Sequence, residues 1–252
     1  MRIDKYLSEK FGSRTKAAEA VSKGLIIVNG KTVSPSYEVK SDDNIKILEA
    51  EENFVSVGGF KLSKALKDFG YSPEGRIFAD IGASTGGFTD CLLQNGAKKV
   101  YCIDVGESQL DKSLKSKNIV IIDNFNAREL NKSLFAEQLD GAVIDVSFIS
   151  LTYILEAAAN ILPRNAAVIA LIKPQFECES RKVGKNGIVK DVKTHEKIIR
   201  KIYDFSVQCG LQPIKLTNAP IVHGKNMEYL ILLQKSAERK TKIEYLLKSV
   251  KL

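Results

Sequence analysis

A glycine-rich segment is the first part of the chain whose residue types suggest chemistry. It follows the apolar run 77–81 and consists of Gly82, Ala83, Ser84, Thr85, Gly86, Gly87 and Phe88. Glycines directly after a buried strand let the backbone approach a ligand at the carboxyl edge of a parallel sheet. No Gly-Lys-Ser/Thr follows, and the spacing is not Gly-x-Gly-x-x-Gly, which excludes a phosphate loop and a dinucleotide fingerprint. A tight turn without a ligand is the alternative.

Two aspartates follow the next two apolar runs. Asp104 stands about 20 residues beyond the glycine segment, where an acidic residue binds ribose hydroxyls in nucleotide-binding folds. Asp123 ends the third run, near the place expected for an adenine amino group. Either residue alone could be a helix cap or a turn former. Together with the glycine segment they predict a nucleoside ligand, with S-adenosylmethionine as the expected cofactor.

An acid and a lysine follow the fourth and fifth apolar runs, and they bear on the reaction. Asp145 is not part of the Asn/Asp-Pro-Pro-aromatic motif of enzymes that methylate exocyclic amines. No cysteine lies near it, which argues against methylation of a pyrimidine carbon. Lys173 ends a strand expected to be buried on both faces, where an amine is costly unless it faces a cleft or has a partner. A paired structural lysine is the alternative.

The composition restricts the class of protein. The 252 residues carry a net charge of +8, which agrees with a polyanionic partner and equally with ordinary solubility. Two histidines, and four cysteines without a C-x-x-C pair, predict that no metal is bound. No apolar run approaches the roughly 18 residues of a membrane span. The N-terminus lacks the apolar core of a signal peptide, so we expect a cytoplasmic protein without membrane contact.

The elements that must position these residues alternate between strands and helices. Strands are predicted at 77–81, 100–103, 120–122, 142–146, 167–172, 214–216 and 229–233. Helices are predicted at 61–69, 88–95, 110–116, 151–160 and 192–208. Short apolar strands separated by helices indicate a mostly parallel sheet covered on both faces. Seven strands, the last after a hairpin-like connection, predict an α/β fold of the Rossmann-like class I methyltransferase type.

Residues 1–48 predict a separate, small α+β domain, followed by a polar linker at 49–57 and a large domain at 58–252. Ile3, Leu7 and Phe11 have helical spacing, and Ser13 is a candidate N-cap for a helix over 14–23. Strands are expected at 25–28, 31–33 and 45–48, with a hairpin turn at Asn29-Gly30.

Basic residues cluster in two places, as expected where RNA phosphates are neutralised. On the two helices of the small domain the candidate RNA contacts are Arg2, Lys5, Lys10, Arg14 and Lys16. A solvated helix face is the alternative there. In the large domain the candidates are Arg181, Lys182 and Lys185.

Ordered blocks over nearly the whole chain resemble a known family. The large domain resembles the TlyA family, haemolysin-A-like ribosomal RNA methyltransferases that are similar to FtsJ-type 2'-O-methyltransferases. The blocks that carry this resemblance are residues 58–62, 80–89, 145–151, 173–177, 183–187 and 224–228. Residues 2–7, 13–14 and 28–30 resemble the RNA-binding domain first described in the fourth small-subunit ribosomal protein. The chain departs from the family pattern in two places. Val57 stands where relatives often have arginine, and the linker 52–55 lacks the basic residue and the tryptophan of some members.

The resemblance implies a site and a reaction. FtsJ-like enzymes use a Lys-Asp-Lys-Glu tetrad, which matches Lys61, Asp145, Lys173 and Glu228. It implies methyl transfer from S-adenosylmethionine to a ribose 2'-hydroxyl, that of a cytidine, in ribosomal RNA within ribosomal subunits. Lys173 would be the general base, with its pKa lowered by burial and by the nearby positive Lys61. Asp145 and Glu228 would orient the lysines and the hydroxyl.

Two other functions stay open on the sequence alone. The family's older name suggests a membrane-lytic protein, but no strongly apolar or amphipathic membrane segment supports it. The second alternative function is that of a non-catalytic, RNA-binding ribosome assembly factor. The presence of all four tetrad residues argues against it. The sequence leaves open which nucleotide and subunit are modified, and the oligomeric state.

Overall fold

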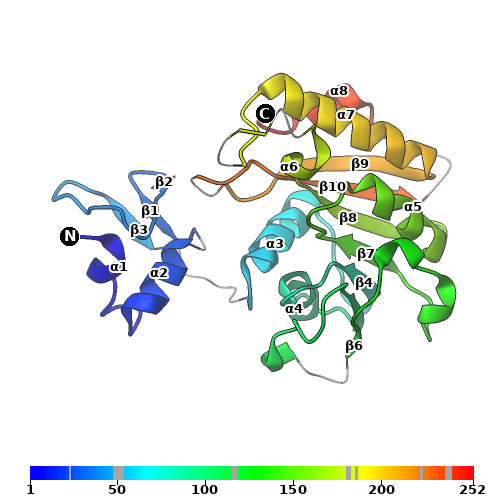
Figure 1. Ribbon diagram of the computed structural model, residues 1–252, viewed down its shortest axis with the longest axis horizontal. Helices are drawn as coiled ribbons and strands as arrows, with labels where there is room; N and C mark the ends of the chain where they lie inside the picture. The colour runs from blue at the N-terminus through cyan, green and yellow to red at the C-terminus, as the bar shows by residue number, and fades with distance from the viewer. Residues whose placement is uncertain are drawn as a thin grey trace. The chain divides into compact units, whose positions relative to one another are not determined.

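The computed structural model describes residues 1–22, 24–47, 54–114, 118–179, 183–184, 187–221, 224–235 and 240–252. The chain forms two compact units, both drawn in Figure 1. The first comprises Met1–Asn53 with Pro220–Asn226, and the second comprises Phe54–Ala219 with Met227–Leu252. Within the described ranges, no helix is long and apolar enough to cross a membrane.

The first unit packs two short helices on a three-stranded antiparallel sheet of order β2-β1-β3. Its elements are α1 (Ile3–Tyr6), α2 (Arg14–Ser22), β1 (Ile26–Val28), β2 (Lys31–Thr32) and β3 (Ile45–Ile47). Asn29 and Gly30 have φ values of 51° and 78°, which close the β1–β2 hairpin as the Asn-Gly signal predicts.

Only the first turn of the expected N-terminal helix is α-helical. The helix α1 ends at Tyr6 with Leu7 as its C-cap, and Gly12, with a φ of 75°, turns the chain toward α2. Leu7 is buried and Phe11 packs against the same cluster, so the predicted apolar face is confirmed although the helix is not continuous. Ser13 Oγ accepts a hydrogen bond from Lys16 N at 3.2 Å, which confirms the N-cap.

The second unit is built on a seven-stranded sheet of order β6-β5-β4-β7-β8-β10-β9. Its strands are β4 (Ile77–Ile81), β5 (Lys99–Ile103), β6 (Ile119–Ile122), β7 (Gly141–Ile144), β8 (Ala167–Ile172), β9 (Leu211–Asn218) and β10 (Tyr229–Lys235). β10 runs antiparallel to β8 and β9, whereas β4 to β8 pair in parallel. The predicted Rossmann-like fold with a final hairpin is confirmed.

Helices cover both faces of this sheet (Figure 1). The α-helices are α3 (Val57–Phe69), α4 (Gly87–Gln94), α5 (Thr152–Ile161), α6 (Pro174–Glu177), α7 (Val192–Gln208) and α8 (Ile243–Lys248). Short 3-10 turns among the described residues are η1 (Lys112–Leu114), η2 (Ala127–Glu129) and η3 (Lys132–Leu134).

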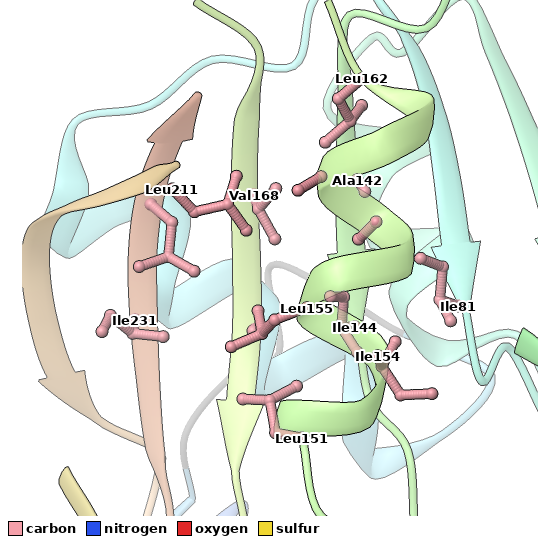
Figure 2. Close-up of a cluster of buried hydrophobic side chains, with 14 of the residues drawn as sticks. Ile81, Ala142, Ile144, Leu151, Ile154, Leu155, Leu162, Val168, Leu211 and Ile231 are labelled. Carbon is pink, nitrogen blue, oxygen red and sulfur yellow. The ribbon is translucent and has the colours of Figure 1, made fainter. Parts of the chain in front are cut away.

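Two apolar cores lie on the two sides of the sheet. Ile77 and Ile81 of β4 enter the core with α5 and α7, while Phe78 enters the core with α3 and α4, because successive strand side chains point to opposite faces. Figure 2 shows Ile154 and Leu155 of α5 directed at β7 and β8. These cores hold the carboxyl ends of β4, β5, β7 and β8 at one edge of the sheet.

Two segments near that edge differ from expectation. The helix expected at 110–116 is only the turn η1 in the described residues, because Leu110 and Leu114 pack on Gly86 instead of continuing a helix. The second unit begins at Phe54, four residues before the expected start at 58, because Phe54 is buried against Gly59 at the start of α3.

Candidate active site

The glycine segment joins the carboxyl end of β4 to α4. Gly82 has a φ of 84°, and a Cβ there would lie 2.8 Å from the carbonyl oxygen of Asp145. Gly82 N also donates to Ile103 O at 2.8 Å, so the segment is held between the ends of β5 and β7. Only glycine fits a backbone of this conformation at this distance.

The next two glycines serve packing. A Cβ on Gly86, whose φ is 91°, would lie 2.5 Å from Leu114 Cδ1, and one on Gly87 would lie 2.1 Å from Ser56 Oγ. Gly87 therefore lets α4 approach the start of α3. The predicted turn is confirmed, and its glycines divide between strand-end geometry and helix packing.

A cavity of about 470 Å³ opens beside this segment. It is lined by Gly82, Ser84, Ile103, Asp104, Val105, Gln109, Phe125, Asn126, Ala127, Asp145, Val146, Ser147, Phe148, Ile149 and Ile154. The Asp104 carboxylate accepts hydrogen bonds from Ser84 N and Gly106 N, each at 2.8 Å. These contacts fix an acid in the cavity wall, with lone pairs left for hydroxyl donors.

Asp123 lies outside the lining of this cavity. Its carboxylate accepts a hydrogen bond from Ser108 N at 2.9 Å, which ties two loops together. Phe125 and Asn126, a few residues further along the chain, line the cavity instead. Sequence reasoning missed these two residues, because an aromatic and an amide in a loop carry no distinctive pattern.

A smaller cavity of about 180 Å³ shares four lining residues with the first. It is lined by Ser56, Gly58, Gly82, Ala83, Ser84, Thr85, Gly87, Phe88, Asp145, Ser147 and Lys173. Most of the predicted glycine-segment residues thus line one cavity or the other. The shared wall includes Asp145 and Ser147, so a ligand in one cavity would touch groups that line the other.

The four residues of the expected tetrad form two ion pairs. Lys173 Nζ lies 2.6 Å from Asp145 Oδ1 and donates to Ser147 Oγ at 2.7 Å. Lys61 Nζ lies 2.6 Å from Glu228 Oε2. The four side chains are only 11–20% exposed.

Sheet register brings the two pairs together. Tyr229 of β10 stands opposite Ile172 of β8 in the last pair of this ladder, and Glu228 and Lys173 are the adjacent residues just beyond it. From the other side, a Cβ on Gly58 would lie 3.7 Å from Asp145 Oδ2, and Lys61 follows one helical turn later on α3.

Asp80 is a carboxyl that the sequence did not single out. It is fully buried below the glycine segment, where Thr89 Oγ1 donates to its Oδ2 at 2.6 Å. Its Oδ1 has no hydrogen-bond partner among the described residues. Burial raises the pKa of Asp80 to about 7, and the charges of Asp145 and Asp104 add to the effect, while the Thr89 hydrogen bond opposes it.

Phe148 is an exposed aromatic side chain at the rim of the larger cavity. It is 91% exposed, although it follows the strand end that carries Asp145. Its φ of 63° is rare for an aromatic residue, and its ring lies 5.1 Å from that of Phe176. Strained backbone that keeps an apolar ring in solvent is typical of a binding site.

The candidate RNA contacts of the small unit are all exposed: Arg2, Lys5, Lys10, Arg14 and Lys16. The candidates Arg181, Lys182 and Lys185 lie outside the described residues.

Comparisons with known proteins assign both units of the chain to families. A model of FtsJ-like methyltransferases matches residues 54–236, and one of the S4 domain matches residues 1–45. The chain belongs to the FtsJ-like methyltransferase family. It is 43% identical to Hemolysin A of Brachyspira hyodysenteriae, over 91% of this chain and 98% of that one.

Two further relatives extend this FtsJ-like match. The chain is 33% identical to the 16S/23S rRNA (cytidine-2'-O)-methyltransferase TlyA of Mycobacterium tuberculosis, over 90% of this chain and 86% of that one. A hemolysin-named protein of known structure from Streptococcus thermophilus has a TM-score of 0.75 and 38% identity, over 98% of this chain and 94% of that one.

S-adenosylmethionine is the methyl donor of FtsJ-like methyltransferases, and the larger cavity fits it. The Asp104 carboxylate is placed for ribose hydroxyls, and the apolar side chains of Ile103, Phe125 and Ile149 can flank a nucleobase. Gly82 lets the backbone approach the ligand without a side chain. The methyl donor would then lie beside the wall formed by Asp145 and Ser147.

Proposed function

We propose that the protein transfers the methyl group of S-adenosylmethionine to the 2'-hydroxyl of a cytidine in ribosomal RNA. The observation that carries this proposal is the Lys173–Asp145 pair at the junction of the two cavities. It offers an amine beside a site that fits the cofactor. Ribosomal RNA as substrate is supported by the matched S4 domain and by the name of the TlyA relative.

Lys173 is the general base of the proposed reaction. Bound S-adenosylmethionine supplies a methyl group on a positively charged sulfur. Once it has lost its own extra proton, Lys173 Nζ would accept the proton of the 2'-hydroxyl while the oxygen bonds to the methyl carbon. The bond between that carbon and sulfur would break, leaving its electron pair on a neutral sulfur. Asp145 and Ser147 hold Nζ from two directions, at 2.6 and 2.7 Å, which keeps the amine aimed at one point. A positioned base contributes about 10²–10⁴-fold to the rate.

The Lys61–Glu228 pair positions the acceptor. Both side chains are mostly buried, and their contact fixes two charged groups next to Lys173 on the same sheet edge. Hydrogen bonds from such fixed groups can hold a ribose hydroxyl in line with the methyl carbon. Glu228 also links β10 to α3, so the acceptor site depends on the final hairpin of the sheet.

The exposed ring of Phe148 suits the base of the target nucleotide. A nucleotide must leave its stack to bring a 2'-hydroxyl into a cavity of this size, and stacking on an aromatic ring compensates for part of that cost. Phe148 presents such a surface at the cavity rim, and the ring of Phe176 packs beside it.

The test is methyl transfer from tritium-labelled cofactor to purified ribosomal subunits, intact ribosomes and naked ribosomal RNA, with mapping of the modified nucleotide. Lys173→Ala should lower the rate by about 10²–10⁴-fold without weakening cofactor or RNA binding. Lys193→Ala is the matched control, because Lys193 is an exposed lysine on α7 outside both cavities.

Two outcomes would contradict the proposal at different levels. Normal transfer by the Lys173→Ala variant would remove Lys173 from the role of base. A protein that binds cofactor and RNA but methylates none of the three substrates would favour a non-catalytic assembly factor.

A further inference from the structure

Asp4 is a buried carboxylate that holds two exposed arginines in the small unit. Arg2 donates to it twice, from Nε to Oδ1 at 3.2 Å and from Nη2 to Oδ2 at 2.8 Å. Arg14 donates from Nε to Oδ2 at 3.1 Å. The Asp4 side chain is 4% exposed, whereas those of Arg2 and Arg14 are 46% and 56% exposed. The acid thus lies beneath two guanidinium groups that face solvent.

The arrangement brings together two segments of the small unit. Arg2 precedes α1 and Arg14 begins α2, so the two arginines are far apart along the chain and meet only through Asp4. Burial raises the pKa of Asp4, but the hydrogen bonds and charges of Arg2 and Arg14 outweigh that effect and hold it below its ordinary value. Asp4 is therefore ionised at neutral pH, and the cluster keeps one net positive charge.

Most donors of the two arginines remain available. A guanidinium group has five N–H donors. Arg2 uses two of them and Arg14 uses one on Asp4, and the others have no protein acceptor in the part of the chain that the structure describes. The planar guanidinium fork suits the oxygens of a phosphate. A carboxylate that holds both arginines in advance removes part of the ordering entropy of binding.

We propose that Asp4 is a positioning residue that presents Arg2 and Arg14 as a single binding site for one backbone phosphate of RNA. The inference deepens the proposed function, since it assigns the site through which the small unit grips its ribosomal RNA. The exposed Lys5, Lys10 and Lys16 surround it with further positive charge.

The test uses a change for which charge and positioning predict opposite signs. Asp4→Asn removes a negative charge from an RNA-binding surface, so electrostatics alone predicts tighter binding. Loss of orientation predicts weaker binding, and we expect about tenfold. Glu9→Gln is the matched control, because it removes one exposed negative charge from the same unit without touching either arginine, and it should tighten binding up to about twofold.

Affinity is measured by filter binding of the full-length protein to ribosomal RNA extracted from subunits, without cofactor. Binding by Asp4→Asn that equals or exceeds the wild type would overturn the inference. Because the assay requires no methyl transfer, a protein that binds normally but does not methylate counts against the proposed function alone.

A second variant protects the test from a folding defect. Arg14→Lys keeps the charge but loses the planar fork, so it should weaken binding several-fold in the wild type and have little further effect in Asp4→Asn. Thermal unfolding monitors the fold of both variants. If Asp4→Asn unfolds the small unit, Arg14→Lys decides: unchanged affinity would overturn the inference, and a several-fold loss in a folded protein would support it.

Discussion

Replacing Gly82 by alanine should damage the active site more than the fold. Its φ of 84° is unfavourable for any residue with a Cβ and costs about 1–2 kcal/mol of stability. The new Cβ would lie 2.8 Å from the Asp145 carbonyl oxygen, and an ordinary contact needs 3.4 Å, so Asp145 must move by about 0.6 Å. Asp145 holds Lys173 at 2.6 Å, so the proposed base moves with it.

The size of the effect follows from that displacement. A misplacement of 1 Å in a reacting group costs about 10²-fold in rate, so about 0.6 Å should lower methyl transfer by about tenfold or more. Gly75→Ala is the matched control: its φ of 69° carries the same backbone penalty, but nothing lies within 4 Å of the new Cβ.

The assay compares methyl transfer per folded molecule with the free energy of unfolding from urea titration. Both variants should lose similar stability from the backbone, while only Gly82→Ala loses activity. Equal activities for the two variants would refute the close approach of Gly82 to Asp145 as the reason for glycine here.

Three further changes test other parts of the site. The pKa of Asp80 is raised from 3.8 to about 7 in the folded state, so the unfolded chain releases this proton first and the wild type loses stability as pH rises from about 4 to about 7. Asp80→Asn has no such proton and should therefore gain stability relative to the wild type over that range, and no more above it. A stability difference in urea unfolding that does not depend on pH would contradict this. Phe148→Asn should leave stability unchanged, since the ring is 91% exposed. It should lower kcat/KM for ribosomal RNA about tenfold, because base stacking on the ring is lost. Unchanged kcat/KM would show that the ring does not contact the acceptor. Tyr229→Phe removes the hydroxyl that lies 2.8 Å from the buried His195 Nδ1 and should cost about 1–3 kcal/mol of stability in thermal unfolding. Tyr203→Phe removes a part-buried hydroxyl and should cost less. Equal losses of stability would contradict the importance of the buried hydrogen bond.

Much of the fold was predictable from local patterns. The strands at 77–81 and 167–172 and the helix at 192–208 have the bounds that the apolar runs and their flanking residues indicate. The helix expected at 110–116 is only a 3-10 turn over Lys112–Leu114, and residues 115 and 116 lie outside the described residues. Leu110 and Leu114 pack on Gly86, a contact that no local pattern contains.

The site was predictable only in part. The glycine segment and Asp104 have types and spacing that chemistry explains, and Asp145 and Lys173 stand out as polar residues at strand ends. Lys61, Glu228 and the grouping of all four as a tetrad came from family resemblance. Phe125, Phe148 and Asp80 carried no signal, since an aromatic loop residue or a strand aspartate has many ordinary uses. Only the structure distinguishes them: Phe125 lines a cavity, Phe148 has a positive φ, and Asp80 is completely buried.

The sequence by itself determined that strands alternate with helices, that a glycine turn follows one of those strands, and that an acid or a lysine ends several others. These are local properties, because periodicity and turn chemistry act over a few residues. Only the tertiary structure decided which ends meet. Lys61 and Glu228 are 167 residues apart, and Lys173 meets Asp145 because β8 lies next to β7 in the sheet. Such partners are set by strand order and by burial of both sheet faces, which depend on the whole chain at once.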